Sequence, residues 1–143
     1  MNRRFAGIAA VLALLSVASC GRSSGPAMYD VSGAVTFDGK PLPMGRMTFV
    51  PDSRAGNTGP AGHADIADGR FDTRHGGRGT VGGPHLVYID GYGEPQTVFD
   101  ADAGENVTKP VRLFSAYEQR VELPNATATM DFEVPASAAP GAR

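Results

Sequence analysis

Histidines next to carboxylates are the residues of this sequence whose types suit acid–base catalysis. His63 lies two positions before Asp65, and His75 lies three positions after Asp72. Either histidine with its carboxylate can be written as an acid–base pair. Nucleophilic hydrolysis also needs an activated serine or cysteine, and no Gly-x-Ser-x-Gly segment occurs in the chain. We therefore expect these polar residues to be solvated, and we expect no catalytic residue.

Metal ligation is the second chemistry that these residue types offer. The histidines lack the close spacing of a zinc motif: His63, His75 and His85. Calcium binding by the acidic residues Asp100, Asp102 and Glu105 is the alternative to a protein without metal. Our expectation is a protein without a metal or another cofactor.

Aromatic side chains supply a possible binding surface. The chain has no tryptophan, so a sugar or small ligand would have to stack on tyrosines, of which Tyr88, Tyr92 and Tyr117 are the candidates. The formal net charge is −2, and the Lys and Arg residues do not cluster. Binding to nucleic acid depends on clustered positive charge, so nucleic acid is not an expected partner.

The only cysteine, Cys20, stands at the end of an apolar segment that follows Arg3 and Arg4. A basic start, a short apolar run and small residues at the end are typical of a secretory signal peptide. The run is shorter than the roughly 20 residues of a membrane-spanning helix. Because Cys20 directly follows Val-Ala-Ser, the site resembles the lipobox of bacterial lipoproteins. It predicts removal of residues 1–19, lipidation of Cys20, and a membrane-anchored protein outside the cytoplasm.

The exported part is expected to have three segments. Residues 20–28 are small and polar, which suits a lipidated cysteine followed by a flexible tether. Residues 29–134 alternate apolar and polar side chains and are rich in glycine and proline, a pattern that predicts an all-β domain. Residues 135–143 are expected to bury nothing and to form a loose tail.

The expected strands number about seven and favour a two-sheet sandwich. The expected strand segments are residues 31–37, 46–50, 62–67, 70–73, 85–89, 110–114, 118–123 and 127–134. The first two are expected to pair with each other around Asp38-Gly39. Two long loops are expected, a mobile one at residues 52–60 and an acidic one at residues 91–109. His85 alternates with apolar residues, which predicts a packed ring with backbone partners.

Four segments carry a family resemblance: VSGAVTFDGKPLPMGRMTFVPD, ADIADGRF, GGPHLVYIDG and AYEQRVELPNATATMDFEVP. Their order and spacing resemble the small lipoproteins abundant in planctomycete bacteria, which are grouped with carboxypeptidase regulatory-like, transthyretin-like domains. The resemblance implies a seven-stranded prealbumin-like sandwich and no established activity. Hydroxyisourate hydrolases share that fold but end in Tyr-Arg-Gly-Ser, a sequence that this chain lacks.

Together these observations predict a non-catalytic interaction or structural module of the cell envelope. It would face the periplasm or the cell surface, attached by a lipid anchor, and would contact an envelope protein. Addition of a strand to a sheet edge is the simplest binding mode for such a domain. A carbohydrate- or small-ligand-binding module is the alternative.

Overall fold

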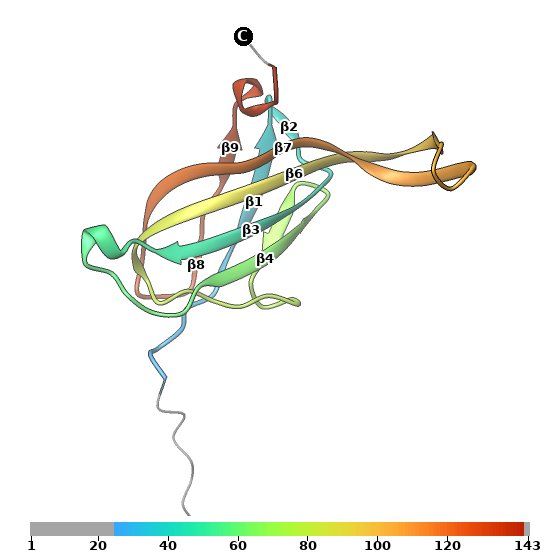
Figure 1. The fold of residues 1–143 in the computed structure, drawn as a ribbon. Coiled ribbons are helices and arrows are strands. Elements are labelled where there is room, and N and C mark those ends of the chain that lie inside the picture. The colour runs from blue at the N-terminus through green and yellow to red at the C-terminus, as the bar shows by residue number, and fades with distance from the viewer. Residues whose placement is uncertain (1–24, 142–143) are drawn as a thin grey trace, which may run out of the picture.

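A computed structural model describes residues 25–141, and nearly all of its regular structure is β-strand (Figure 1). The predicted signal peptide and Cys20 lie outside these residues. No helix in the described range is long and apolar enough to span a membrane. The strands are β1 (Val31–Phe37), β2 (Lys40–Pro41), β3 (Met44–Pro51), β4 (Gly62–Ala67), β5 (Arg70–Asp72), β6 (Gly83–Asp100), β7 (Glu105–Leu123), β8 (Ala128–Thr129) and β9 (Phe132–Val134).

The strands form one curled sheet in the order β2-β1-β5-β4-β3-β6-β7. Neighbours in this order run antiparallel, while the short strands β8 and β9 pair with β1 in parallel. The expectation of an all-β chain is confirmed in this form.

The predicted pairing of the first two long strands is wrong. Directly after the Asp38-Gly39 turn, β1 pairs with the two-residue strand β2, whereas β3 pairs with β4 and β6. Leu42, between two prolines, is fully buried, and its N–H donates to the Val35 carbonyl oxygen. Because burial of Leu42 turns the chain into the core, the return strand joins the sheet at a distance from β1.

The curl of the sheet closes over one apolar core, which alternate residues of the strands supply. The fully or almost fully buried apolar residues are Val31, Val35, Leu42, Met47, Phe49, Ala64, Ile66, Phe71, Val87, Ile89, Phe114, Leu123, Phe132 and Val134. Phe132 of β9 packs edge-on against Phe49 of β3, with ring centroids 6.3 Å apart. Strands distant in the sheet order therefore meet in the core.

The strand predicted at residues 127–134 is divided into β8 and β9. Between them the Ala34 N–H donates to Asp131 Oδ1 at 2.8 Å, so a side chain takes the place of a backbone acceptor. The Met130 carbonyl oxygen approaches Gly33 so closely that a Cβ there would overlap it. The hydrogen bond and the close approach explain why the ladder along β1 is interrupted at this point.

The prediction of an acidic loop at residues 91–109 is also wrong. β6 and β7 continue through it as a two-stranded hairpin that projects from the body (Figure 1). The two predicted strands 110–114 and 118–123 belong to the single strand β7, in which Ala116 has a φ of 49°. We call residues 93–111 the arm.

The loop predicted to be mobile at residues 52–60 is fastened to the body. Its 3-10 turn η1 (Ser53–Ala55) is capped by Asp52, whose Oδ1 accepts the Arg54 N–H at 3.0 Å. Asn57 Nδ2 donates to the carbonyl oxygens of Gly82 and Pro84, each at 2.8 Å. These bonds give the loop a defined conformation.

The C-terminal segment begins with a second 3-10 turn, η2 (Ala136–Ala138). Ala138 is partly buried and packs against the core. The first residues after β9 thus contact the body, which differs from the expectation that nothing in this segment is buried.

Candidate functional site

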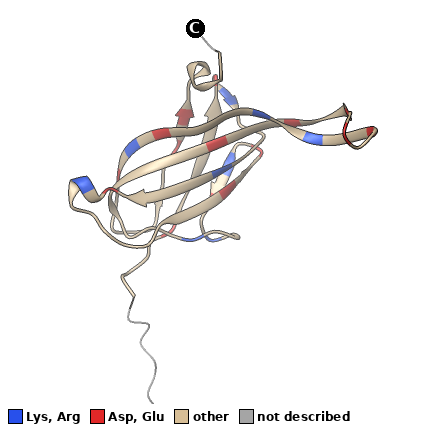
Figure 2. Cartoon of the chain, in the orientation of Figure 1, with Lys and Arg blue, Asp and Glu red and all other residues tan. Residues whose placement is uncertain are grey.

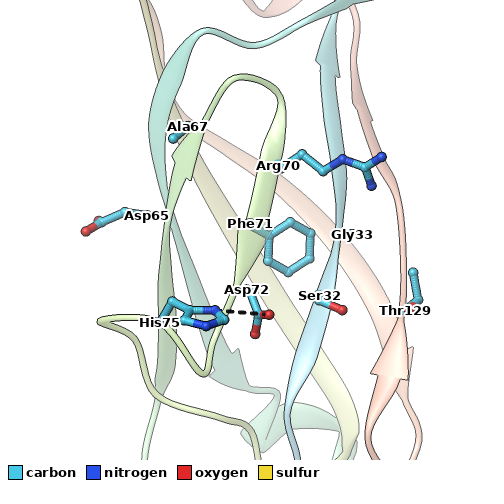
Figure 3. Close-up of a pocket in the computed structure, with 9 residues that line it drawn as sticks. All are labelled: Ser32, Gly33, Asp65, Ala67, Arg70, Phe71, Asp72, His75 and Thr129. Carbon is cyan, nitrogen blue, oxygen red and sulfur yellow. Dashed lines mark ion pairs between the residues drawn. The ribbon is translucent and has the colours of Figure 1, made fainter.

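An open depression of about 600 Å³ is hollowed into the described surface. It lies over β1, β4, β5 and β8 and is lined by Ser32, Gly33, Asp65, Ala67, Arg70, Phe71, Asp72, His75 and Thr129 (Figure 3). Alternation along the strands places the polar side chains of Ser32, Asp65 and Asp72 on the outer face. Much of the exposed lining is nevertheless apolar.

Asp72 is the most strongly interacting charged group of the depression. Arg74 donates to it through Nη2 at 2.7 Å and through Nε at 2.9 Å. His75 Nδ1 lies 3.2 Å from Asp72 Oδ2. The hydrogen bonds from Arg74 hold the pKa of the Asp72 carboxyl well below its usual range. An aspartate that is this acidic is a poor proton acceptor.

The depression brings a serine, a histidine and an aspartate together but not in the order that catalysis requires. Ser32 is the cross-strand neighbour of Asp72, and His75 approaches the same carboxylate from the other side (Figure 3). Nucleophilic catalysis needs the histidine between the serine and the carboxylate. In addition, the His75 side chain is 81% exposed. The geometry therefore provides no activated serine.

The other two histidines have separate surroundings. Asp65, the predicted neighbour of His63, instead lies 3.8 Å from Arg46. His85 is buried, as its alternation predicted, and its Nδ1 lies 2.9 Å from the Gly83 carbonyl oxygen. Its Nε2 has no hydrogen-bond partner among the described residues, so only one of the two expected backbone partners is present.

The acidic residues considered for calcium are part of a turn at the tip of the arm. The N–H groups of Asp102 and Ala103 donate to Asp100 Oδ1 at 3.1 and 3.2 Å. The Asp100 side chain thus caps the turn. The Gly104 N–H closes the turn by donating a hydrogen bond to the Asp100 carbonyl oxygen. Residues 25–141 contain no group of three or more His, Cys, Asp or Glu side chains placed to hold a metal ion.

The three candidate tyrosines do not form one surface. Tyr88 lies on the outer face of β6 beside Glu118, and desolvation together with this negative charge raises the pKa of its hydroxyl. Tyr117 is the cross-strand neighbour of Ile89 and packs against the core. Tyr92 lies at the base of the arm with the Arg112 guanidinium 5.6 Å from its ring centroid.

Tyr88 borders a hollow. This second depression has a volume of about 230 Å³ and also includes Arg54, Glu118 and Arg120. It lies at the end of the body that carries η1. A small ligand would find one aromatic ring there, between charges of both signs.

The arm projects from the body with most of its side chains exposed, and the sequence analysis did not predict it (Figure 1). Phe99, near its tip, is 67% exposed, and Val111, near its base, is 37% exposed. The β-formers Thr97, Val98 and Phe99 stand opposite Thr108, Val107 and Asn106. Symmetric runs of β-formers around Asp-Ala-Gly are the signal that would have indicated a hairpin. Charges of both signs are spread along the arm (Figure 2).

The comparisons with known proteins leave the family open. No protein-family model matches the chain, and no curated protein matches it. A solved structure, a 9R-lipoxygenase from Cyanothece PCC8801, is 13% identical over a match that covers 76% of this chain and 16% of the lipoxygenase, with a TM-score of 0.31. A likeness at this TM-score carries no argument about fold or function.

Proposed function

We propose that this protein is a lipid-anchored, non-catalytic interaction module of the cell envelope, and that its arm contacts a partner protein. The proposal includes lipidation at Cys20 and a transthyretin-like sandwich related to carboxypeptidase regulatory-like domains. The projecting arm is the observation that carries it.

An arm of this kind is difficult to explain without a partner. A lone two-stranded hairpin is marginal in water, because neither face is covered by other strands. Most arm residues are exposed, among them the large apolar side chain of Phe99. Exposed apolar groups on a projecting element are typical of an interaction surface. A second chain on the arm would cover these groups and stabilise the hairpin.

The position of the arm suits an anchored protein. The described N-terminal segment leaves the body on a side distant from the arm (Figure 1). A chain tethered through Cys20 would therefore present the arm away from its attachment point. Two or more acyl chains make such an attachment stable, since each buried methylene contributes about 0.8 kcal/mol.

The geometry of the large depression supports a role without catalysis. Asp72 lies between Ser32 and His75 and is held ionised by Arg74. Side chains arranged in this way make a charged surface and do not make a nucleophile. Sugar or small-ligand binding is the alternative, for which Tyr88 beside its hollow is the relevant residue.

Capture from cross-linked envelopes tests the proposal with the full acylated chain. In the test variant, Asn-Gly replaces residues 93–111 and joins Tyr92 to Arg112 as a short hairpin. We expect this variant to lose its protein partner while Arg78→Ala, an exposed change in the segment between β5 and β6, retains it. Equal capture by the shortened chain would contradict an interaction through the arm.

The anchor has its own test. Cys20→Ser should abolish fatty-acid labelling and retention in the membrane fraction, because the thiol is the acceptor of the lipid. Labelling that persists in this variant would exclude Cys20 as the lipidated residue.

A further inference from the structure

The arm has a free edge on each side. β7 is the last strand of the sheet, and β6 loses its second neighbour beyond the Met44–Tyr92 pair. Each edge exposes backbone N–H and C=O groups that can accept another strand. The two edges differ in sequence, so they can be compared as docking sites.

The prolines of the arm determine which backbone groups face outward. Pro95 stands opposite Pro110, and neither has an N–H, so this pair cannot exchange hydrogen bonds. The register is regular from this pair to the turn. In an antiparallel ladder, residue pairs that exchange hydrogen bonds (bonded pairs) alternate with pairs that do not (non-bonded pairs). Thr97–Thr108 is therefore a second non-bonded pair, in agreement with the 2.8 Å between its two hydroxyl oxygens.

The same alternation makes Phe99–Asn106 a non-bonded pair. The backbone N–H and C=O groups of Asn106 and Thr108 therefore point away from β6, toward the free edge of β7. An added antiparallel strand would bond to these two residues. Pro110, which has no N–H to offer, limits the length of the added ladder.

The charges along β7 are complementary to those of a second, antiparallel copy of β7. Glu105 precedes Val107 by two positions, and Lys109 follows it by two positions. An antiparallel copy related by a two-fold axis at Val107 places each Glu105 opposite Lys109 of the other copy. The same axis places Asn106 opposite Thr108, so the outward-facing backbone groups meet. Opposite charges directly across a ladder are stabilising.

The β6 edge lacks this complementarity. A two-fold axis at Val98 would place Gln96 opposite Asp100, without an opposite charge. It would also bring Glu94 toward Asp102. Pairing through β7 is therefore favoured over pairing through β6.

We propose that two copies of this chain pair through the β7 edges of their arms, antiparallel and about a two-fold axis at Val107. The inference rests on the proposed function and names the partner as a second copy. The half-buried Val107 side chains would meet at the axis. Because each arm contributes the same edge, the contact is self-complementary and closes as a dimer.

Paired cysteine variants of the full acylated chain test the geometry. Val107→Cys should form a disulfide-linked dimer under mild oxidation with copper phenanthroline and oxygen, which accept the electrons and protons of the two thiols. The two-fold axis brings both Val107 Cα atoms to about 4.5 Å, within the range of a disulfide. Val98→Cys is the matched control, since it is half-buried and opposite Val107 on the same arm. This control and the wild-type chain should remain monomeric on a non-reducing gel.

Charge reversal tests the register independently. Glu105→Lys or Lys109→Glu alone should weaken dimerisation about tenfold in sedimentation experiments, because like charges then face each other. The double variant Glu105→Lys/Lys109→Glu restores opposite pairs and should dimerise like the wild type. A double variant as weak as the single ones would overturn the proposed register.

The outcomes separate this inference from the proposed function. Equal cross-linking at positions 98 and 107, or none at either, overturns pairing about Val107. Cross-linking of Val107→Cys to a different envelope protein overturns the second copy as partner but leaves the arm as an interaction surface. If the variant with the shortened arm captures partners normally, the proposed function is wrong, irrespective of whether the arms of two copies pair.

Discussion

The strands β6 and β7 have one environment in the body and another in the arm. In the body, His85, Val87 and Ile89 of β6 are buried between β3 and β7 and covered by the core. In the arm, β6 and β7 still pair with each other, but β6 lacks its neighbour β3 and most side chains of both strands are exposed. The two strands pair antiparallel in both regions, although their register shifts between Ile89 and Pro95. The difference shows that hydrogen bonding shapes the arm, whereas burial holds the body together.

Amide hydrogen exchange should reveal the largest difference between the two regions. For the monomeric chain, we expect the amides of Val87 and Ile89 to exchange several orders of magnitude more slowly than those of Val107 and Lys109. Core strands open only with global unfolding, whereas an uncovered hairpin opens locally. Equal protection in both regions would show that the arm is stable without a cover.

The same measurement on the dimer sharpens the comparison. The amides of Asn106 and Thr108 should be exposed in the monomer and become protected on dimerisation, since they face the free edge. The amides of Thr97 and Phe99 face the other edge and serve as the control. Protection that appears on all four amides alike would indicate general stiffening of the arm.

Removal of a phenylalanine should affect the body far more than the arm. Phe49→Ala leaves a cavity against Phe71 and Phe132 and should lower the free energy of unfolding by about 3–5 kcal/mol. Phe99→Ala removes an exposed ring and should change it by less than about 0.5 kcal/mol in the monomer. Denaturant titration of both variants measures the difference. Similar losses would mean that the arm contributes to the core.

An added methyl group should distinguish a crowded glycine from an open one. Gly33→Ala places a Cβ against the Met130 carbonyl oxygen and should destabilise the chain by about 1–3 kcal/mol, because backbone must move. Gly93→Ala in the arm meets its nearest atom, on Leu113, at 3.4 Å and should be tolerated. Thermal unfolding compares the two. A neutral Gly33→Ala would contradict the close approach of β1 to the segment after β8.

The smallest effect concerns the charged outer face of the body. The lowered pKa of Asp72 means that its contribution to stability is present above the ordinary value of 3.8 and is lost as pH falls through the folded-state pKa. Arg74→Gln should return the pKa of Asp72 toward 3.8, so that this contribution is lost at a higher pH. Carboxyl titration by NMR measures the shift. Arg46→Gln, which removes the partner of Asp65, should leave Asp72 unchanged.

Sequence reasoning identified the strands of the body because burial has a period of two along them. The strands predicted at residues 31–37, 46–50 and 62–67 correspond to β1, β3 and β4, and the burial of His85 was predicted correctly. The arm was missed because its side chains alternate between two exposed faces, which leaves no apolar period. The Asp72–Arg74–His75 cluster was found only in part, since nothing local indicated that Arg74 would bind the carboxylate.

The sequence by itself determined the all-β class and the positions of most strands in the body. These follow from side-chain polarity and backbone preference, which act over a few residues. Only the tertiary structure decided which strands pair, because Leu42 enters the core and carries β3 away from β1. It also decided that Asp72 would separate Ser32 from His75, since side chains distant in sequence meet only after the sheet has curled.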